Sequence, residues 1–447
     1  MPPRGIPASF WRGGTSRGLL FRPEHLAPYP QHVRDRIILT ALGSPDPAGR
    51  QISGLGGGVS SLSKAAIIGV PGEATDLQKE YGPLPGVPWA DHGERNGQSW
   101  DVVYRFAQVG VREPELDWTA SCGNVFAAAA VAALSVPLLP YTTLFTRARS
   151  LPPSSDPDAP ILFPLSILSA SNGALMRARV PLDPLSLQIW EPPAGQGAEV
   201  AGVPGRDEPG IMVEMPLDGS AEKGGLVTGQ PRDVVRLDDG TEVTVSVLTS
   251  GLPNIFLPLA SLRAAAGSSS LDVPADLLTL PASTLSAHVE LCHLLEQIRV
   301  AAARQFNIPL SLASPKITLI GPVPESGYRT TAGTTVPAAD ADVLVRAISS
   351  GDWHATIPGT TLGALNVGAG VPGTVVQEIV KQGERAGAAA ETAAKDQVVT
   401  VRAAHAAGVA ESSVRFTADG TPESVVMVRT AREIMRGEVL VPERILY

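Results

Sequence analysis

Short runs in which apolar and polar residues alternate dominate the chain. Alternation with a period of two is typical of half-buried strands, and 45 glycines and 41 prolines place turn residues between these runs. Representative runs cover residues 101–106, 210–215 and 242–247. We therefore expect strands to outnumber helices.

Four longer stretches have helical spacing or an alanine-rich composition instead. They cover residues 124–133, 288–305, 359–368 and 384–395. Strands mixed with a few helices predict an α+β fold. Each half of the chain holds one apolar helix rich in Ala and Gly, at 124–133 and at 359–368, and each begins at a turn that contains glycine. We expect two pseudo-equivalent domains, although no residue-level repeat connects them.

Length and punctuation also favour two domains. A chain of 447 residues is typically divided into domains of roughly 200 residues. Residues 192–209 are rich in Gly, Pro and acidic residues, and residues 151–160 are polar and rich in proline. We expect one of these segments to be an insertion and the other to connect the domains.

Composition and charge limit the classes of binding partner that fit this chain. Hydrophobic residues make up 44% and charged residues 18%, and no apolar run of about 18 residues is present, which argues against disorder and against a membrane span. The net charge is −9, without the dense basic run that nucleic-acid binding needs. An anionic small molecule would have to be bound by a few local Arg and Lys side chains and by helix N-termini. Only two cysteines predict a reducing compartment such as the cytoplasm, while early arginines leave a mitochondrial location open.

The segment from Trp11 to Gly18 is the first candidate site. Arg12 and Arg17 flank a Gly-Gly-Thr-Ser turn in which Thr15 and Ser16 supply hydroxyl groups. Arginine binds carboxylates in a bidentate manner, and glycine lets the backbone approach a ligand. A hairpin turn with two solvated arginines explains the same pattern.

The second candidate runs from Gly54 to Lys64. Gly57 and Gly58 lie in a run of three glycines that serines follow, a pattern typical of an anion-binding nest. A surface loop with a solvated lysine is the alternative. Ser61 and Lys64 also have the Ser-x-x-Lys spacing of penicillin-binding proteins, but the Lys-Thr-Gly of those enzymes is missing from the chain.

The third candidate is Cys122, within Ser121-Cys122-Gly123-Asn124 at the start of the alanine-rich helix. A thiol at a helix N-terminus lies in the positive end of the helix dipole, which favours the thiolate and a role as proton carrier. A small buried hydrophobe is the alternative, and it is the only interpretation for Cys292. The histidines lack metal-site spacing, so no metal is predicted. His354 has either a catalytic role or a place in the core.

Several motifs, taken in order, resemble the PrpF family of methylaconitate and related isomerases, whose fold is similar to that of diaminopimelate epimerase. The resemblance runs nearly from end to end. The motifs are Arg12-Gly13-Gly14-Thr15-Ser16-Arg17-Gly18, the segment Gly56 to Lys64, Ser121-Cys122-Gly123-Asn124, Ser314-Pro315-Lys316-Ile317, Tyr328-Arg329-Thr330-Thr331, Val371-Pro372-Gly373-Thr374, and Arg429-Thr430-Ala431-Arg432 leading to Gly437.

The resemblance implies two domains, each a barrel-like sheet around a central helix, with the active site in the cleft between them. It places residues 1–200 and 437–447 in the first domain and 201–436 in the second. Lys64 corresponds to the family's base, and Cys122 lies beside the substrate. The expected substrate-binding residues are Arg12, Thr15, Ser16, Arg17, Gly57, Gly58, Ser60, Ser61, Gly123, Asn124, Ser314, Lys316, Thr331, His354 and Thr360.

Two departures from the related epimerases affect the mechanism. The second central helix offers Thr360 and Thr361 where those epimerases place a second thiol, which disfavours two-faced racemisation. Asn254 follows Pro253 instead of preceding it, which puts a ligand contact by this asparagine in doubt.

The predicted function is therefore an isomerase that needs no cofactor or metal and shifts a proton in a small unsaturated di- or tricarboxylic acid. Either Lys64 or Cys122 is the base. A keto–enol tautomerase, a binding protein without catalysis, and acyl transfer through Ser61 are the alternatives. The oligomeric state is open, with a homodimer as one option.

Overall fold

A computed structural model describes most of the chain. The described residues are 3–71, 94–95, 98–119, 122–135, 138–152, 156, 159–170, 173–217, 223–268, 271–382 and 398–447. The helix expected at 384–395 and residue Ser121 lie outside them. Contacts between Cα atoms divide the chain into unit 1, residues 1–215 with 428–447, and unit 2, residues 216–427.

The division between the units differs from the expected boundaries at 200/201 and 436/437. The strand at Ile211–Pro216 pairs with Leu175–Leu182 of unit 1, so unit 1 extends to residue 215. The last long strand pairs with the first strand from Arg4↔Val441 to Gly13↔Ala431. This pairing brings the whole C-terminal segment from residue 428 into unit 1.

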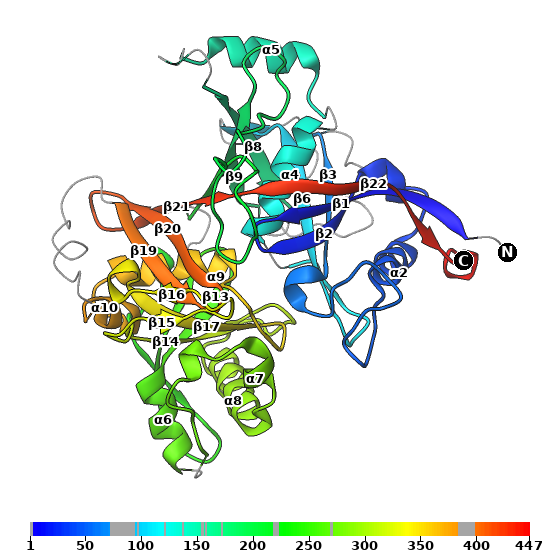
Figure 1. Ribbon diagram of the computed structural model, residues 1–447. Helices are drawn as coiled ribbons and strands as arrows, with labels where there is room; N and C mark the ends of the chain where they lie inside the picture. Colours follow the sequence, from blue (N-terminus) through cyan, green and yellow to red (C-terminus); the bar gives the residue numbers. More distant parts are fainter. Residues whose placement is uncertain are drawn as a thin grey trace. The chain divides into compact units, whose positions relative to one another are not determined.

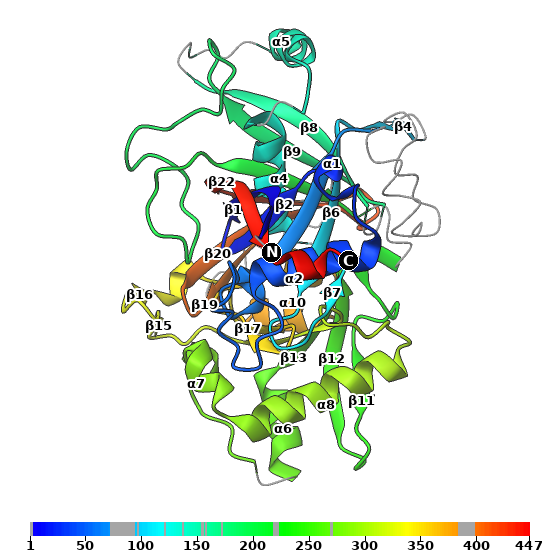
Figure 2. The same ribbon diagram turned by 90° about the vertical axis from the view of Figure 1, so that its right-hand side faces the viewer.

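Unit 1 begins and ends in the same sheet, and its C-terminal end lies beside helix α2 (Figures 1 and 2). Its strands are β1 (Arg4–Gly13), β2 (Ser16–Phe21), β3 (Lys64–Gly69), β4 (Glu94–Arg95), β5 (Gln98–Ser99), β6 (Val102–Val109), β7 (Leu116–Asp117), β8 (Ile161–Ser169), β9 (Leu175–Leu182), β10 (Ile211–Pro216) and β22 (Ala431–Val441). Its helices are α1 (Pro23–Leu26), α2 (Gln31–Leu42), η1 (Ser60–Leu62), α4 (Gly123–Ser135), α5 (Tyr141–Ser150) and η5 (Glu443–Ile445).

Unit 2 contains the remaining elements. Its strands are β11 (Asp233–Arg236), β12 (Glu242–Thr249), β13 (Pro253–Pro258), β14 (Lys316–Gly321), β15 (Tyr328–Arg329), β16 (Thr335–Val336), β17 (Val343–Ser349), β18 (Asp352–Trp353), β19 (Val398–His405), β20 (Gly408–Phe416) and β21 (Pro422–Arg429). Its helices are η2 (Lys223–Gly225), α6 (Leu259–Ser268), η3 (Leu277–Thr279), α7 (Ala282–Ser286), α8 (Val289–Gln305), η4 (Ala338–Asp340), α9 (Gly359–Gly370) and α10 (Val375–Val380).

The sheets of the two units have the same succession of strand pairings. In unit 1 the order is β22-β1-β2-β3-β6-β8-β9-β10, with β2–β3 and β6–β8 parallel and the other pairs antiparallel. In unit 2 the order is β11-β12-β13-β14-β17-β19-β20-β21, with β13–β14 and β17–β19 parallel and the others antiparallel. The parallel pairs occupy the same places in both orders. The two units thus share one order and direction of strand pairings.

Each unit packs its sheet against one buried helix. Helix α4 contacts β1, β2, β3, β6, β9 and β22, and Figure 1 shows it among these strands. In unit 2, α9 contacts β12, β13, β19 and β20. Alanine is the strongest helix former, and its small side chain lets strands come close. The alanine-rich pattern at 124–133 thus predicted α4 well, with all of residues 123–133 buried.

The other helices cover the outside of each sheet. Helix α8, predicted over 288–305, buries Leu291, Leu295 and Ile298 along one face, the spacing of an amphipathic helix. Helices α6, α7 and α8 lie together at one side of unit 2 in both views (Figures 1 and 2). Cys292 is partly buried; it packs against this core and accepts a hydrogen bond from Trp353 Nε1 at 3.3 Å.

Neither proline-rich segment connects the two units. Residues 151–160 and 192–209 both belong to unit 1, and the chain crosses to unit 2 at 215/216. The segment 192–209 contains no helix or long strand, and it leads back to β10 of the same sheet. No helix in the described part of the chain is long and apolar enough to span a bilayer.

Candidate active site

Lys64 is a buried lysine at the first position of β3. Its side chain is 6% exposed, and Nζ donates a hydrogen bond to Gln108 Oε1 on β6 at 2.5 Å. Nζ also lies over the Phe106 ring, 5.4 Å from its centre. Burial lowers the pKa of Lys64, and the charge of Cys122 opposes this in part. Among the described residues no carboxylate forms an ion pair with Lys64 that would raise its pKa again.

Gln108 is fixed so that its oxygen faces Lys64. Its Nε2 donates to Ser60 O at 3.0 Å and to Ser63 O at 3.1 Å. Because the amide nitrogen is used by these carbonyls, Oε1 remains as an acceptor for Nζ. The position follows from register, since Lys64 and Gln108 are directly paired across β3 and β6.

Cys122 lies directly before α4, as predicted. Its carbonyl accepts the N–H of Phe126 at 2.9 Å, the hydrogen bond that opens the helix. Tyr104 Oη donates to the same carbonyl at 3.4 Å. Burial and the charge of Cys122 raise the pKa of Tyr104 well above its usual value, so this phenol stays neutral. A thiolate at Cys122 would face the positive end of α4.

Asn124, in the first turn of α4, links the helix to the β1–β2 hairpin. Its Nδ2 donates to Thr15 Oγ1 at 3.2 Å and to Ser16 Oγ at 3.3 Å. Its Oδ1 accepts from Arg429 Nε at 2.9 Å. Gly13 and Gly14 allow this approach, because a Cβ at Gly13 would lie 2.0 Å from the Asn124 carbonyl oxygen. The structure therefore brings Thr15, Ser16 and Asn124 together.

Arg429 was not among the expected site residues, although its motif was recognised. It is 6% exposed, and Nη1 donates to Val428 O at 2.8 Å. Burial lowers the pKa of Arg429 to about 10, while the charge of Cys122 acts in the opposite direction. The guanidinium remains charged at neutral pH. Gln108 and Tyr104 were missed too, because each lies in a buried strand without a motif.

Arg12 and Arg17 have different surroundings from each other. Arg12 Nη2 forms an ion pair with Glu208 at 3.0 Å, and Nη1 donates to Thr430 Oγ1 at 2.9 Å. Its charge is thus balanced by a protein carboxylate, and a substrate contact by Arg12 stays a prediction. Arg17 lies over the Phe10 ring, 5.7 Å from its centre. Its Nη2 would be 2.8 Å from a Cβ at Gly57, so Arg17 and Gly57 are neighbours.

The glycine-rich loop is tightly packed and only partly open to a ligand. Gly58 has φ +74° and donates its N–H to Gln51 Oε1 at 2.9 Å. Gly56 donates its N–H to Leu42 O at 3.1 Å. Two of the amides expected in an anion nest are therefore used within the protein, and the glycines serve close packing. Ligand contacts by Gly57, Ser60 and Ser61 stay predictions, with both serines in η1.

Five expected site residues lie in unit 2. Lys316 begins β14 and donates from Nζ to Ala313 O at 3.1 Å. His354 is 8% exposed, and its Nδ1 accepts the N–H of Thr356 at 3.2 Å, which fits a core histidine. Thr331 is exposed and donates to Ala406 O at 3.2 Å. Ser314 and Thr360 are buried, Thr360 in the first turn of α9.

The head of α9 differs chemically from that of α4. Pro358 occupies the position before the helix, where α4 has Cys122. Asn254 is fully buried, accepting from Thr361 Oγ1 at 2.7 Å and donating to Leu252 O at 2.7 Å. These two bonds give Asn254 a structural role in joining hairpin and helix.

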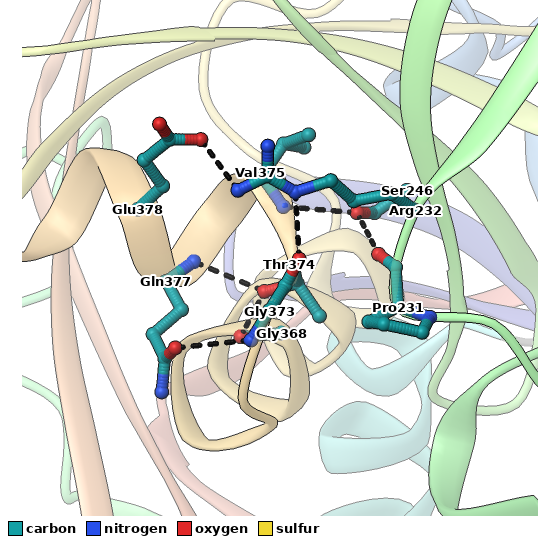
Figure 3. Close-up of polar contacts among 9 residues, drawn as sticks. All are labelled: Pro231, Arg232, Ser246, Gly368, Gly373, Thr374, Val375, Gln377 and Glu378. Carbon is teal, nitrogen blue, oxygen red and sulfur yellow. Dashed lines mark hydrogen bonds and ion pairs between the residues drawn. The ribbon is translucent and has the colours of Figure 1, made fainter.

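The motif Val371–Thr374 has a structural role as well. Figure 3 shows Thr374 between α9 and α10. Thr374 Oγ1 donates to Gly368 O at 2.5 Å and accepts from Gln377 N at 3.0 Å, which caps α10. Arg232 ties the turn down by donating to Gly373 O at 2.7 Å and pairing with Glu378. The motif holds the C-terminal end of α9.

Comparison with known proteins identifies the family of this chain. The sequence profile described as PrpF protein matches residues 4–82 and 94–442. The chain belongs to the PrpF family. This confirms the resemblance inferred from the motifs.

Two relatives and one crystal structure show what this PrpF-family chain is similar to. The 2-methyl-aconitate isomerase of Shewanella oneidensis is 30% identical, over 98% of this chain and 97% of that protein. The 4-oxalomesaconate tautomerase of Pseudomonas putida is 30% identical, over 68% of this chain and 66% of that protein. The crystal structure of a methylitaconate-delta-isomerase aligns with a TM-score of 0.62 and 25% identity, over 100% of this chain and 98% of that one. The expected α+β fold and the expected class of enzyme, an isomerase, agree with these findings.

The residues around Cys122 in this PrpF-family chain include groups that titrate and a group that carries a fixed charge. In the described part of the chain, no group of three or more His, Cys, Asp or Glu side chains is placed to hold a metal ion. The groups that gather around Cys122 are an amine, a guanidinium and a phenol. Such groups can move a proton and bind an anion.

Proposed function

We propose that the chain is a cofactor-independent isomerase that moves a proton, and with it a double bond, in an unsaturated di- or tricarboxylic acid of the aconitate or methylaconitate type. The observation that carries this proposal is the environment of Lys64, a buried amine with a lowered pKa and no acidic partner in the described residues. The names of the relatives support the substrate class.

Lys64 acts first as the base. The neutral amine takes a proton from a carbon allylic to the double bond, and the C–H electron pair spreads over the allyl system onto a carboxylate. The ammonium of Lys64 then returns that proton at the other end of the allyl system, which shifts the double bond. Return at the original carbon after rotation gives a cis–trans change instead. General acid–base catalysis of this kind contributes about 10²- to 10⁴-fold.

Cys122 is the alternative base. A polyanionic substrate favours the charged form of Lys64, which would leave the lysine as an electrostatic clamp and the thiolate as proton carrier. The lowered pKa of Lys64 and its fixed acceptor Gln108 favour the lysine. In that case Cys122 contacts the substrate and the N-terminal end of α4 stabilises the enolate oxygens.

The finer fold prediction belongs to the same proposal. We infer that each unit forms a barrel-like sheet around its buried helix, and the strands that contact α4 and α9 support this. The predicted active site in a cleft between two domains stays a prediction, as do substrate contacts by Ser314, Lys316 and Thr360.

Exchange of deuterium from solvent into the substrate tests the reaction. Wild-type protein should exchange the allylic hydrogen of aconitate-like acids, and Lys64→Ala should lower the rate about 10³-fold. Cys122→Ser should have a smaller effect of about tenfold if the thiol only contacts the substrate. The reverse order would make Cys122 the base, and full activity in both variants would reject the mechanism.

A keto–enol tautomerase is the second candidate, and the relative named 4-oxalomesaconate tautomerase favours it. The same base could move a proton between carbon and an enol oxygen. Proton NMR on a panel of oxo-substituted and unsubstituted unsaturated acids separates the two activities. If no acid in the panel exchanges or isomerises, the chain is a binding protein and the proposal fails.

A further inference from the structure

Arg429 is a buried cation whose charge no described carboxylate balances. Its Nε and Nη1 are fixed by Asn124 Oδ1 and Val428 O at 2.9 and 2.8 Å. Both acceptors are neutral, and Nη2 makes no hydrogen bond to any residue in the described ranges. Burying a guanidinium without a counter-charge is costly. Arg12 differs from Arg429 in this respect, because Glu208 of the same unit balances its charge.

We propose that Arg429 binds a carboxylate of the substrate through Nη2. The inference rests on the proposed function, because it concerns the same site. Asn124 orients the guanidinium, since its own amide nitrogen is held by Thr15 and Ser16 and its oxygen therefore faces Nε. Two of the three nitrogen groups are occupied, so the contact to the ligand is a single charge-assisted hydrogen bond.

The position of Arg429 next to Cys122 says which carboxylate it binds. Arg429 Nε bonds to Asn124, two residues after Cys122, and helix α4 also contacts β3, the strand that Lys64 begins. The charge of Cys122 also acts on both cations, so the base and the guanidinium lie in the same small region. A carboxylate there is attached to the carbon system from which the proton is taken. Negative charge on its oxygens grows as the dienolate forms, so the hydrogen bond from Arg429 strengthens in the transition state. Arg429 should therefore affect kcat as well as KM.

Three variants of Arg429 and one control test this assignment. Arg429→Met removes the charge, and Arg429→Lys keeps it but loses the planar contact with Asn124. Arg429→Ala leaves space for an added guanidinium, and Arg436→Met is the control. Arg436 is an exposed arginine on β22 whose partner is Glu433 at 2.7 Å. Circular dichroism and thermal unfolding establish that each variant is folded.

Binding is measured with propane-1,2,3-tricarboxylate, a saturated acid that cannot react. Isothermal titration should show about 10- to 100-fold weaker binding by Arg429→Met, the range expected for one hydrogen bond to a charged group. Arg429→Lys should lose less, and Arg436→Met should bind like wild type. With a reacting substrate, kcat of Arg429→Met should fall about 100-fold. Added ethylguanidinium should restore part of the activity of Arg429→Ala, which a merely structural role would not produce.

The outcomes separate this inference from the proposed function. A folded Arg429→Met that binds the tricarboxylate as tightly as wild type overturns the inference, as does wild-type protein that does not bind it. If Arg429→Met does not fold, unchanged binding and kcat in Arg429→Lys together with no ethylguanidinium rescue overturns it. Wild-type protein that binds the tricarboxylate through Arg429 but isomerises nothing keeps the inference and rejects the proposed function.

Discussion

The two units share one order of strands, but the side chains at equivalent positions have different partners. Lys64 and Lys316 each begin a strand that lies parallel to the second strand of a hairpin, paired with Gly18 in unit 1 and Asn254 in unit 2. Lys64 donates to the side-chain amide of Gln108, and its burial lowers its pKa. Lys316 meets a backbone carbonyl of the preceding turn. The same position in the topology thus carries a buried lysine in both units, with a side-chain acceptor in unit 1 and a backbone acceptor in unit 2.

The helix heads differ in the same way. Helix α4 is preceded by Cys122, whereas α9 is preceded by Pro358. The hydrogen bonds between helix and hairpin are also reversed: in unit 1 the helix supplies the amide of Asn124, and in unit 2 the hairpin supplies the amide of Asn254. Topology can therefore be repeated without repeating chemistry. The asymmetry favours one acid–base centre over two opposed ones.

The largest expected effect comes from cutting the link between helix and hairpin in unit 1. Asn124→Ala should lower the free energy of unfolding by about 3 kcal/mol, because it leaves the buried charge of Arg429 without its acceptor. Thr361→Val, the matched change in unit 2, should cost about 1 kcal/mol because no charge is involved. Urea unfolding measures both, and equal losses would contradict the comparison.

Substitutions at Gln108 test whether Lys64 is the base, because they should change the pH dependence of the exchange rate. The rate of exchange should rise with pH as Lys64 loses its proton, and its midpoint should lie below the usual lysine pKa because burial lowers it. Gln108→Leu should slow exchange about 30-fold through lost orientation and move the midpoint lower, since the ammonium loses an acceptor. Gln108→Glu should move it higher, because a carboxylate stabilises the ammonium. A midpoint that does not respond to either change would remove Lys64 from the base role.

Lys316 should matter less than Lys64. If Lys316 only binds an anion, Lys316→Met should raise KM about tenfold and leave kcat nearly unchanged, as expected for contacts equally strong in ground and transition states. Steady-state kinetics on the same substrate as Lys64→Ala provide the comparison. A large fall in kcat would show that the two lysines share the proton transfer.

The smallest effect should come from the capping contacts of unit 2. Thr374→Ala should cost about 1 kcal/mol, typical of a lost N-cap. Thr374→Ser keeps the hydroxyl and serves as the control. Urea unfolding should place Thr374→Ser within about 0.5 kcal/mol of wild type, and no difference between the two variants would show that the hydroxyl does not hold the end of α9.

Local patterns predicted the parts of the site that depend on neighbours in sequence. The alanine run predicted α4, and the residues before it placed Cys122 at its start. The glycine run at 56–58 was interpreted as an anion nest, but it lies packed against Gln51 and Leu42. A run of glycines indicates that the backbone approaches another group closely, but it does not show whether that group is a ligand or another part of the protein.

The remaining residues of the site depend on contacts between distant segments. Arg429 reaches Asn124 across 305 positions, and Glu208 neutralises Arg12 from a segment without regular structure. Whether an arginine is free for a ligand or paired within the protein depends on such contacts, so sequence reasoning could not distinguish Arg12 from Arg429.

The order of residues along the chain was sufficient to determine the class of fold and the family, and it singled out a lysine and a thiol as candidates for the chemistry. Periodicity and motifs are local properties of the sequence, so they can be recognised before the tertiary contacts are known. Only the tertiary structure decided which arginine charges are balanced by a carboxylate and which side-chain amide faces Lys64. These properties are differences in electrostatic free energy, and they exist only when the chain has excluded water and set its charges at definite distances.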